Sequence, residues 1–412
     1  MLELSRTLFL VSFAAYLLGS VAYISGVVGV RMAARVKSAS LAPGPGTVAL
    51  PAERKTMDRW PVWGMYLVAA GVLLHAGGIV ARWLGAGYWP ISNMYEFMNF
   101  FGFGIMVMFL WINRQYRVPA LGAVMAPVGM LILAYASIFP RDVQPLIPAL
   151  QSYWLVLHVS VAALGEAAFA VSFGAGLMYL LRAQNTEEFG KWGGRLLEFA
   201  LYCLVALAGF VGMALLFKAR GYQVPLPDGS YYSLPPLIGP SGFQGELTRF
   251  AGLPLPLFET PAWMAGVNAA QKWNTIVLSL VLGTLVYAVL RLAVRMPLRE
   301  RIGRWLSHLD LDVLDDISYK GVAVGFPLFT LGGLLFAMIW AQQAWGRFWG
   351  WDPKEVWALI TWLVYSGYLH LRMTRGWRGA KAAWLTVMGF VVVLFTLLGV
   401  NLLIVGLHSY AV

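Results

Sequence analysis

The sequence contains a single cysteine among its 412 residues, and this scarcity excludes several classes of function. Cys203 lies within an apolar run, where we expect it to be a packing residue. Without a C-x-x-C pair the chain cannot carry out dithiol exchange, and without C-x-x-C-H it cannot be a c-type cytochrome. Any thiol chemistry therefore belongs to a substrate or to a partner.

Charged residues are also scarce, at 12% of the chain against 59% hydrophobic residues. A soluble domain carries about a quarter charged residues, so this composition predicts a polytopic membrane protein. The net charge of +11 would suggest nucleic-acid binding in a soluble protein. However, the chain has no basic tail or nucleic-acid module, and its basic residues separate apolar runs, where they set membrane orientation. We therefore expect no nucleic-acid partner.

A membrane-spanning helix needs about 20 largely apolar residues, and the sequence holds about ten such runs. They lie near Thr7–Val30, Pro61–Leu84, Met94–Trp111, Val118–Phe139, Tyr153–Leu181, Leu196–Phe217, Trp273–Val294, Gly321–Ala341, Val356–Leu371 and Ala383–Leu407. The first run lacks a basic flank and an obvious cleavage site, so we expect it to be retained. The predicted fold is all-α: one polytopic helix bundle over residues 1–412.

The distribution of Lys and Arg predicts the orientation of these helices. Twenty-one of the thirty fall in five alternate segments: 31–60, 112–117, 182–195, 291–320 and 372–381. The positive-inside rule places these segments in the cytoplasm and both termini outside. Loop 31–60 contains the linker-like stretch Ala42–Thr47. The proline-rich outer loop 218–271 is predicted to lack regular helix, and could dock an extracytoplasmic protein or form a structured cap.

The most unusual stretch is Trp345–Trp357, in which four tryptophans are interleaved with glycines and charged residues. The charges exclude the interior of a span and predict an outer loop over residues 342–356. Clustered indoles suit either a water–lipid boundary or a flat aromatic ligand. Asp352, Pro353 and Glu355 also fit the N-cap, first and third positions of a following helix.

The pattern W-G-x-x-W-G-W-D-P-K-E-x-W-A-L-I-T-W resembles the "WWD" signature of haem-handling proteins in cytochrome c biogenesis, and is most similar to that of the CcsA/ResC family of system II. The resemblance continues at His158, Pro90–Glu96 and Gly406–Tyr410, and covers most of the chain beyond about residue 60. It implies that haem b, bound as a substrate, is moved across the membrane to an outer site. There, cytochrome c haem lyase (holocytochrome c synthase) activity would join it to the CxxCH motif of apocytochrome c.

The resemblance also implies partners and ligands. The partners are apocytochrome c, a ResB/Ccs1-family membrane protein and, indirectly, thiol-reducing proteins. His158 and His408 match the two outer haem ligands of the family, and His370 matches its transmembrane histidine. The alternative for His158 and His408 is that each is a boundary residue bonded to a backbone carbonyl. His370 lies about 20 Å along a helix from Trp357, and an ionisable group at such a depth is functional by default. His75 is also mid-membrane, where it could be an inner ligand or a packed histidine bonded across helices.

The remaining site residues lie in or next to the Trp-rich stretch, and we expect them to act together with the two outer histidines. We expect His158, His408, Trp349, Trp351 and Asp352 to form the catalytic set. The indoles predicted to pack against the macrocycle are Trp345, Trp349, Trp351 and Trp357. The cations Arg347 and Lys354 could contact either haem propionates or lipid phosphate and solvent.

One segment departs from the family. Where the family often has a histidine before P-x-S-N-x-Y-E, this chain has Tyr88 and Trp89, so we assign no ligand there. Glu96 in this segment either pairs with a basic group or faces water.

Two other functions stay open at this point. A haem exporter without ligation activity would share these features. A b-type haem electron-transfer subunit would place histidine pairs on facing helices at matched depth, and has no need for a Trp-rich outer loop. We expect a bacterial plasma membrane, with the thylakoid membrane as the alternative, because system II operates in both.

Overall fold

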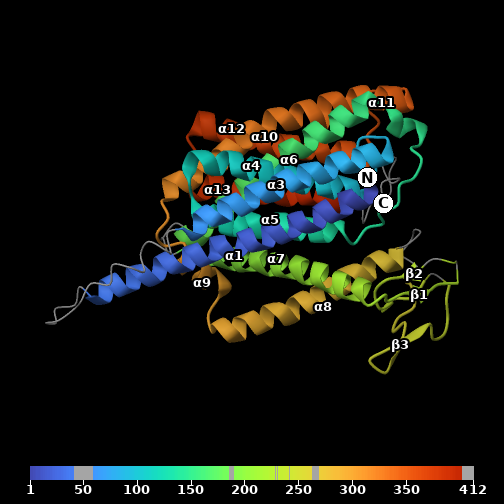
Figure 1. Ribbon diagram of the computed structural model, residues 1–412, viewed down its shortest axis with the longest axis horizontal. Coiled ribbons are helices and arrows are strands. Elements are labelled where there is room, and N and C mark those ends of the chain that lie inside the picture. Colours follow the sequence, from blue (N-terminus) through green and yellow to red (C-terminus); the bar gives the residue numbers. More distant parts are fainter. Residues whose placement is uncertain are drawn as a thin grey trace. The chain divides into compact units, whose positions relative to one another are not determined.

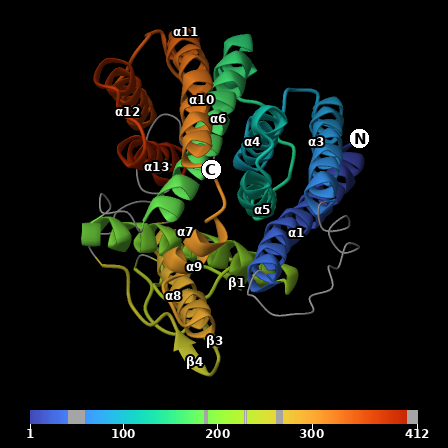
Figure 2. The same ribbon diagram turned by 90° about the vertical axis from the view of Figure 1, so that its left-hand side faces the viewer.

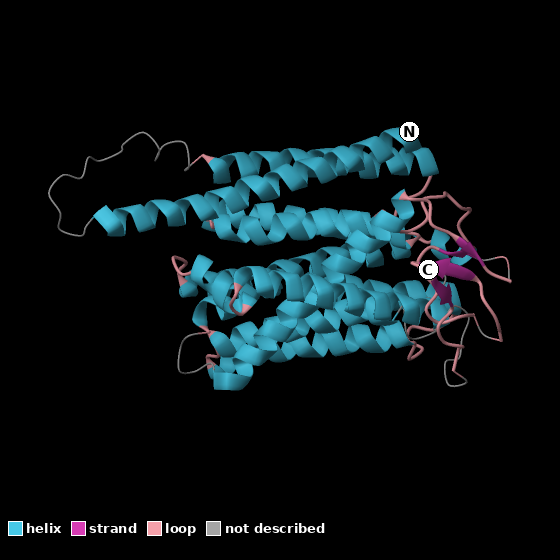
Figure 3. Cartoon of the chain, turned by 90° about the horizontal axis from the view of Figure 1, so that it is seen from below, coloured by secondary structure: helices cyan, strands magenta, loops and turns pink. Residues whose placement is uncertain are grey.

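The computed structural model describes residues 1–40, 59–184, 190–227, 229, 231–240, 242–261 and 269–400. Within these residues the chain is predominantly helical, and the strands form two short hairpins (Figure 3). The prediction of an all-α polytopic membrane protein is therefore confirmed. Contacts divide the described chain into two compact units, one made of Met1–Gly190 with Ile302–Leu398 and one containing Lys191–Arg301.

Nine helical stretches of the described residues are long and apolar enough to cross a membrane. They correspond to nine of the ten predicted runs. The tenth, Val356–Leu371, lies in helix α12 (Pro353–Arg375), whose charged ends leave it outside this group. At 23 residues, α12 is still about 34 Å long, enough to span a bilayer. The end of the last predicted run lies outside the described residues.

The first unit is a bundle of long helices with roughly parallel axes (Figure 1). Its elements are α1 (Leu2–Ser40), α3 (Trp60–Ala86), α4 (Met94–Tyr116), α5 (Pro119–Ala136), η1 (Pro148–Gln151), α6 (Tyr153–Ala183), α10 (Leu311–Phe329), η3 (Thr330–Phe336), α11 (Ala337–Trp345), α12 (Pro353–Arg375), α13 (Ala380–Leu394) and η4 (Phe395–Gly399). Helix α6 is central, because it packs against α4, α10, α13 and η3. Figure 2 shows it between α10 and α4.

Small residues bring α6 and α10 into backbone contact. A Cβ atom added to Gly165 would lie 2.7 Å from the Phe329 nitrogen, and one added to Gly325 would lie 2.8 Å from the Gly165 oxygen. Close approach through small residues is a common way to pack helices in a membrane. The buried Ser172 hydroxyl adds a hydrogen bond between the two helices, donating to the Ser318 carbonyl at 2.7 Å. These contacts fix the helix pair that carries the candidate site.

Helix α1 is longer than its apolar run, since it continues to Ser40 and so into the predicted loop 31–60. The extension contains alanine, arginine, methionine and lysine, which all favour helix, but its basic and serine residues interrupt the apolar run. The linker-like stretch Ala42–Thr47 lies outside the described residues. Hydropathy therefore located the span but not the end of the helix.

The second unit consists of two long helices, two hairpins and the beginning of a short helix. Its elements are α7 (Gly190–Ala219), β1 (Val224–Pro225), β2 (Tyr231–Tyr232), β3 (Thr248–Phe250), β4 (Leu253–Leu255), α8 (Ala269–Val294) and the start of α9 (Leu298–Trp305). Both hairpins are antiparallel, and they lie in the proline-rich segment that was predicted to lack helix. Glu198 of α7 accepts hydrogen bonds from the backbone of Leu298 and Arg299 at 2.9 and 3.0 Å, which fixes the start of α9.

Candidate functional site

The Trp-rich loop is short, because α11 ends at Trp345 and α12 begins at Pro353. Gly346 adopts a left-handed conformation, with φ of 73°, which ends α11. At the other end, Asp352 accepts from the Lys354 N–H at 3.1 Å, and Glu355 accepts from the Asp352 N–H at 3.1 Å. This capping box confirms the predicted start of α12. Residues 346–352, which we call the Trp loop, are thus held between two helix ends.

The Trp loop presents aromatic surface to its surroundings. Trp351 is 70% exposed although its φ of 57° is unusual for a bulky residue, and Phe348 is 55% exposed. Trp349 meets Trp351 edge to face, with ring centroids 5.9 Å apart. A further indole, Trp357 in the first turns of α12, packs instead against Phe395 at 4.2 Å. Exposed indoles fit both expected settings of this loop, a water–lipid boundary and a flat aromatic ligand.

His158, on the second turn of α6, is oriented by a backbone carbonyl. Its Nδ1 lies 2.8 Å from the oxygen of Gly332 in η3. A carbonyl oxygen can only accept, so Nδ1 carries the proton and a neutral ring has its lone pair on Nε2. Metal-binding histidines are commonly held in this way, with one ring nitrogen donating to a carbonyl or carboxylate.

The contact that orients His158 depends on Gly332. Residues Thr330–Phe336 form a π-helical segment, a feature that recurs at functional sites. A Cβ atom at Gly332 would lie 2.2 Å from the Ala162 nitrogen and 2.6 Å from the Val161 carbonyl carbon. Only glycine therefore allows η3 to approach α6 closely enough for this hydrogen bond.

A row of rings joins His158 to the Trp loop. The imidazole stacks on Trp340, with centroids 5.8 Å apart and planes at 13°, and Trp340 meets Trp345 at 4.8 Å. Trp340 is 2% exposed and donates its indole N–H to the Ala149 carbonyl at 2.9 Å. The sequence reasoning missed Trp340, although its place five residues before Trp345 was a usable signal.

Two cations flank this aromatic surface. Arg347 is exposed, and its guanidinium packs over Gly350, where an added Cβ would lie 2.5 Å from Cζ. Lys354 lies at the start of α12, before the predicted span, and is half-buried. Burial lowers the pKa of its ammonium to about 8, although the carboxyl groups of Asp352 and Glu166 act in the opposite direction. Lys354 therefore stays largely cationic at neutral pH and loses its charge as the pH rises through about 8.

The segment Pro90–Glu96 packs beside the same part of α6. Trp89 donates its indole N–H to Ser160, two residues from His158, at 3.1 Å. Glu96 is buried and accepts from the Arg82 guanidinium at 2.9 Å, so the first of its two predicted environments is confirmed. This ion pair fixes the turn between α3 and α4.

His75 and His370 occupy very different environments. His75 is fully buried, with Nδ1 3.3 Å from the Tyr16 hydroxyl and the Phe9 ring 5.3 Å away, which favours the packed alternative. His370 is on an exposed face of α12, five residues before its end. Because α12 is continuous, the spacing of about 20 Å between Trp357 and His370 is retained. His408 lies outside the described residues.

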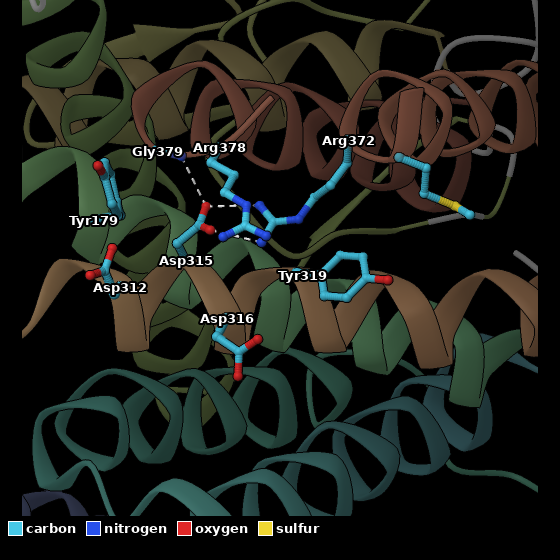
Figure 4. Close-up of a pocket in the computed structure, with 9 residues that line it drawn as sticks. Tyr179, Asp312, Asp315, Asp316, Tyr319, Arg372, Arg378 and Gly379 are labelled. Atoms are coloured by element: carbon cyan, nitrogen blue, oxygen red, sulfur yellow. Dashed lines mark hydrogen bonds and ion pairs between the residues drawn. The ribbon is translucent and has the colours of Figure 1, made fainter. Parts of the chain in front are cut away.

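A polar cavity of about 710 Å³ lies at the end of the first unit near the C-terminus of α12 (Figure 4). It is lined by charged, aromatic and other side chains: Tyr179, Asp312, Asp315, Asp316, Tyr319, Arg372, Met373, Arg378 and Gly379. Arg372 binds Asp315 through two hydrogen bonds of 2.9 and 2.7 Å, and the Gly379 N–H adds a third at 3.1 Å. Such walls suit polar groups better than the face of a porphyrin.

The cavity joins segments that the charge pattern predicts to lie on the same side of the membrane. Asp315 and Arg372 come from 291–320 and 372–381, and the Tyr116 hydroxyl of segment 112–117 donates to Asp316. His158 and the Trp loop lie at the opposite ends of their helices. The alternation of segments is thus consistent with the contacts.

We expect Gly332→Ala to disturb the site without removing any predicted ligand. The added methyl group must push η3 away from α6 and break the hydrogen bond that orients His158, at a cost of about 1–3 kcal/mol in stability. Haem content after purification and cytochrome c yield in a co-expression assay should both fall. Gly367→Ala in α12 is the matched control, because a Cβ there meets nothing within 4 Å. Equal losses in the two variants would contradict this role for Gly332.

These features define a class: a polytopic helical membrane protein with an oriented imidazole beside a Trp-rich loop. The family model described as "Cytochrome C assembly protein" matches residues 91–222 and 274–408, more than half of the chain. The chain therefore belongs to the cytochrome c assembly protein family, and its role is in cytochrome c biogenesis.

Individual relatives support the same family assignment. The chain is 38% identical to the cytochrome c biogenesis protein CcsA of Nostoc punctiforme, over 80% of this chain and 83% of that protein. It is 35% identical to CcsA of Crocosphaera subtropica, over 85% and 88%. It is 36% identical to CcsA of Synechocystis sp., over 80% and 82%. The resemblance to the CcsA family is thus confirmed.

Proposed function

We propose that the protein binds haem b as a substrate beside the Trp loop and presents it for thioether attachment to apocytochrome c. The observation that carries this proposal is the hydrogen bond between His158 Nδ1 and Gly332, which directs the Nε2 lone pair for iron. Trp340 stacks on that imidazole and Trp345 follows it in the same row. Trp345, Trp349 and Trp351 are the proposed aromatic walls for the macrocycle. His408 is the second proposed ligand of the outer site.

The chemistry required of the protein is chiefly positional. Each cysteine thiol of the CxxCH motif adds across one vinyl group: sulfur bonds to one carbon and the hydrogen ends on the other, so no oxidant is consumed. Holding the two reactants in productive geometry can contribute about 7–11 kcal/mol in the best cases. Lys354 and Arg347 are the proposed contacts of the haem propionates, and Asp352 holds the loop through its cap.

The inner site is proposed at His370, on the exposed face of α12, with a second ligand from a partner membrane protein of the ResB/Ccs1 family. Haem would enter from the cytoplasmic side and pass from His370 to the outer site. The buried position of His75 argues for a partner histidine as the second inner ligand. We propose a bacterial plasma membrane as the location, with the thylakoid membrane as the alternative.

The orientation can be tested with reporter fusions. Because Lys and Arg segregate twenty-one to nine, a reporter fused after residue 350 should score as extracytoplasmic and one fused near residue 305 as cytoplasmic. Paired alkaline phosphatase and fluorescent-protein fusions at each point provide the measurement. The reverse result at both points would invert the proposed direction of haem transfer.

Synthase and exporter activity can be separated by co-expressing the chain with a reporter apocytochrome, with and without the partner. A synthase yields covalent haem on the reporter, detected by haem staining after denaturation. An exporter alone would raise extracytoplasmic haem without covalent product. That outcome, in the presence of the partner, would refute the proposed ligation step.

A further inference from the structure

The hairpin β3–β4 in the second unit has one apolar face and one polar face. Its register pairs Phe250 with Leu253 and Arg249 with Pro254. Side chains alternate between the two faces of a strand, and residues directly opposite each other share a face. Phe250 and Leu253 therefore lie on one face and Arg249 on the other. The Arg249 guanidinium is exposed and forms an ion pair with Glu246 at 2.7 Å. Because a lone hairpin is marginally stable in water, its apolar face needs a cover.

Aromatic contacts place this apolar face at the end of α7. The ring of Phe250 lies 5.7 Å from that of Phe217 and 6.3 Å from that of Tyr222, and the latter two rings are 5.0 Å apart. Phe217 lies in the last turn of Trp192–Ala219, a stretch long and apolar enough to cross a membrane. The apolar face of the hairpin is therefore directed toward the point where this span leaves the membrane.

A second contact fixes the chain that follows the hairpin to the start of α8. The buried Asn274 amide donates to the Ile238 carbonyl at 2.8 Å and accepts from the Ile238 N–H at 2.7 Å. Ile238 in turn forms a β-bridge with Phe258, the neighbour of Leu257. Asn274 is the second residue of the apolar span Trp273–Val294. Leu257 and Phe258 are therefore also held at the end of a span.

The apolar side chains at these two span ends stay exposed in the chain itself. Leu253 is 57% and Phe258 65% exposed, and Phe250 and Leu257 are exposed as well. The hairpins lie where α7 ends and α8 begins (Figure 1). Leu216, next to Phe217, is also exposed, so the lipid-facing surface of α7 extends to its last turn. Apolar and aromatic side chains at this level of a membrane protein are typically covered by lipid.

We propose that residues 248–258 form an interfacial membrane anchor. Phe250, Leu253, Leu257 and Phe258 insert among the phospholipid headgroups beside the spans, and Arg249 faces water. The charge pattern predicts that this is the outer leaflet. Lipid fits better than a protein partner, because a protein that approaches from the aqueous side would meet the polar face of the hairpin. Of the two expectations for loop 218–271, the inference favours the structured cap, and it does not depend on the proposed haem site.

The single cysteine of the chain makes a site-specific test possible. Cys203→Ser provides a background in which a nitroxide label reports on one position. Labels on Leu253→Cys and Leu257→Cys examine the apolar side, and a label on Arg249→Cys is the matched control on the opposite face of the same hairpin. The parent labelled at Cys203, which is exposed in the middle of α7, gives the reference for a position in lipid.

The labelled proteins are reconstituted into phosphatidylcholine–phosphatidylglycerol vesicles that contain this chain alone. Power-saturation electron paramagnetic resonance then compares the accessibility of each label to oxygen, which concentrates in lipid, and to a nickel chelate, which stays in water. The labels on Leu253→Cys and Leu257→Cys should be more accessible to oxygen than to nickel, shifted toward the Cys203 reference. The label on Arg249→Cys should show the reverse.

Greater accessibility to nickel at both apolar positions would overturn the inference, and would leave this face free for a protein. A label on Arg249→Cys that also reports lipid would overturn the two-faced orientation. If one of the apolar variants does not fold, the other still decides, because Leu253 and Leu257 are held through different contacts, at α7 and at α8.

Discussion

Replacing His158 by glycine is expected to lower cytochrome c maturation by about a hundredfold or more, because the proposed outer site then loses an oriented iron ligand. Added imidazole should restore part of the activity, since a free ring can occupy the space beside Trp340 and bind iron there. The yield of covalent haem on a co-expressed reporter, with and without imidazole, provides the measurement. Rescue by imidazole would separate a ligand role from a purely structural one.

The control for this variant is His308→Ala, which removes an exposed imidazole from a segment that the charge pattern places in the cytoplasm. It should mature cytochrome c as the parent does. Full activity of His158→Gly would mean that this imidazole is not a required ligand. In that case the bond to Gly332 would serve packing between α6 and η3.

Replacing His370 by alanine is expected to remove most haem from the purified protein, whereas replacing His408 should leave haem bound at the inner site. The reason is distance, because about 20 Å separates His370 from Trp357 and one porphyrin cannot reach both. Pyridine haemochrome quantitation of both variants, purified with the partner, gives the haem content. Equal haem in His370→Ala and the parent would eliminate the inner site and leave a one-site synthase.

A matched variant for His370 is Met373→Ala, one turn further along α12 and 76% exposed. It changes the same exposed region of the helix without removing a nitrogen ligand. Its haem content should equal that of the parent. A comparable loss in Met373→Ala would indicate that the exposed surface of α12, rather than iron ligation by His370, determines haem content.

Local features of the sequence were predictable because their causes lie within a few residues. The cap formed by Asp352 and Glu355 involves only the first turn of α12, so the local sequence was enough to predict it. Apolar runs located the membrane helices for the same reason. The apolar run Thr7–Val30 gave no information on where helix α1 ends, because the helix continues to Ser40 and hydropathy does not measure helix propensity.

The geometry of the site depends on contacts between distant parts of the chain. His158 and Gly332 are 174 residues apart, and no pattern in either segment indicates a π-helical turn at Thr330–Phe336. Trp340 looked like one more apolar residue of its span until its ring was found against His158.

The ends of the α10–α12 region differ in mechanical character. At one end, Arg372 and Asp315 clamp α10 to α12, and the Gly379 N–H extends the clamp to the turn before α13. Toward the other end lie two π-helical segments, η3 and η4, in which the regular ladder of helix hydrogen bonds is interrupted. Separating these helices therefore requires breaking an ion pair at the end that holds Arg372, whereas no ion pair among the described residues has to be broken at the π-helical segments. We expect the helices to separate more easily toward the Trp loop than at the Arg372 end.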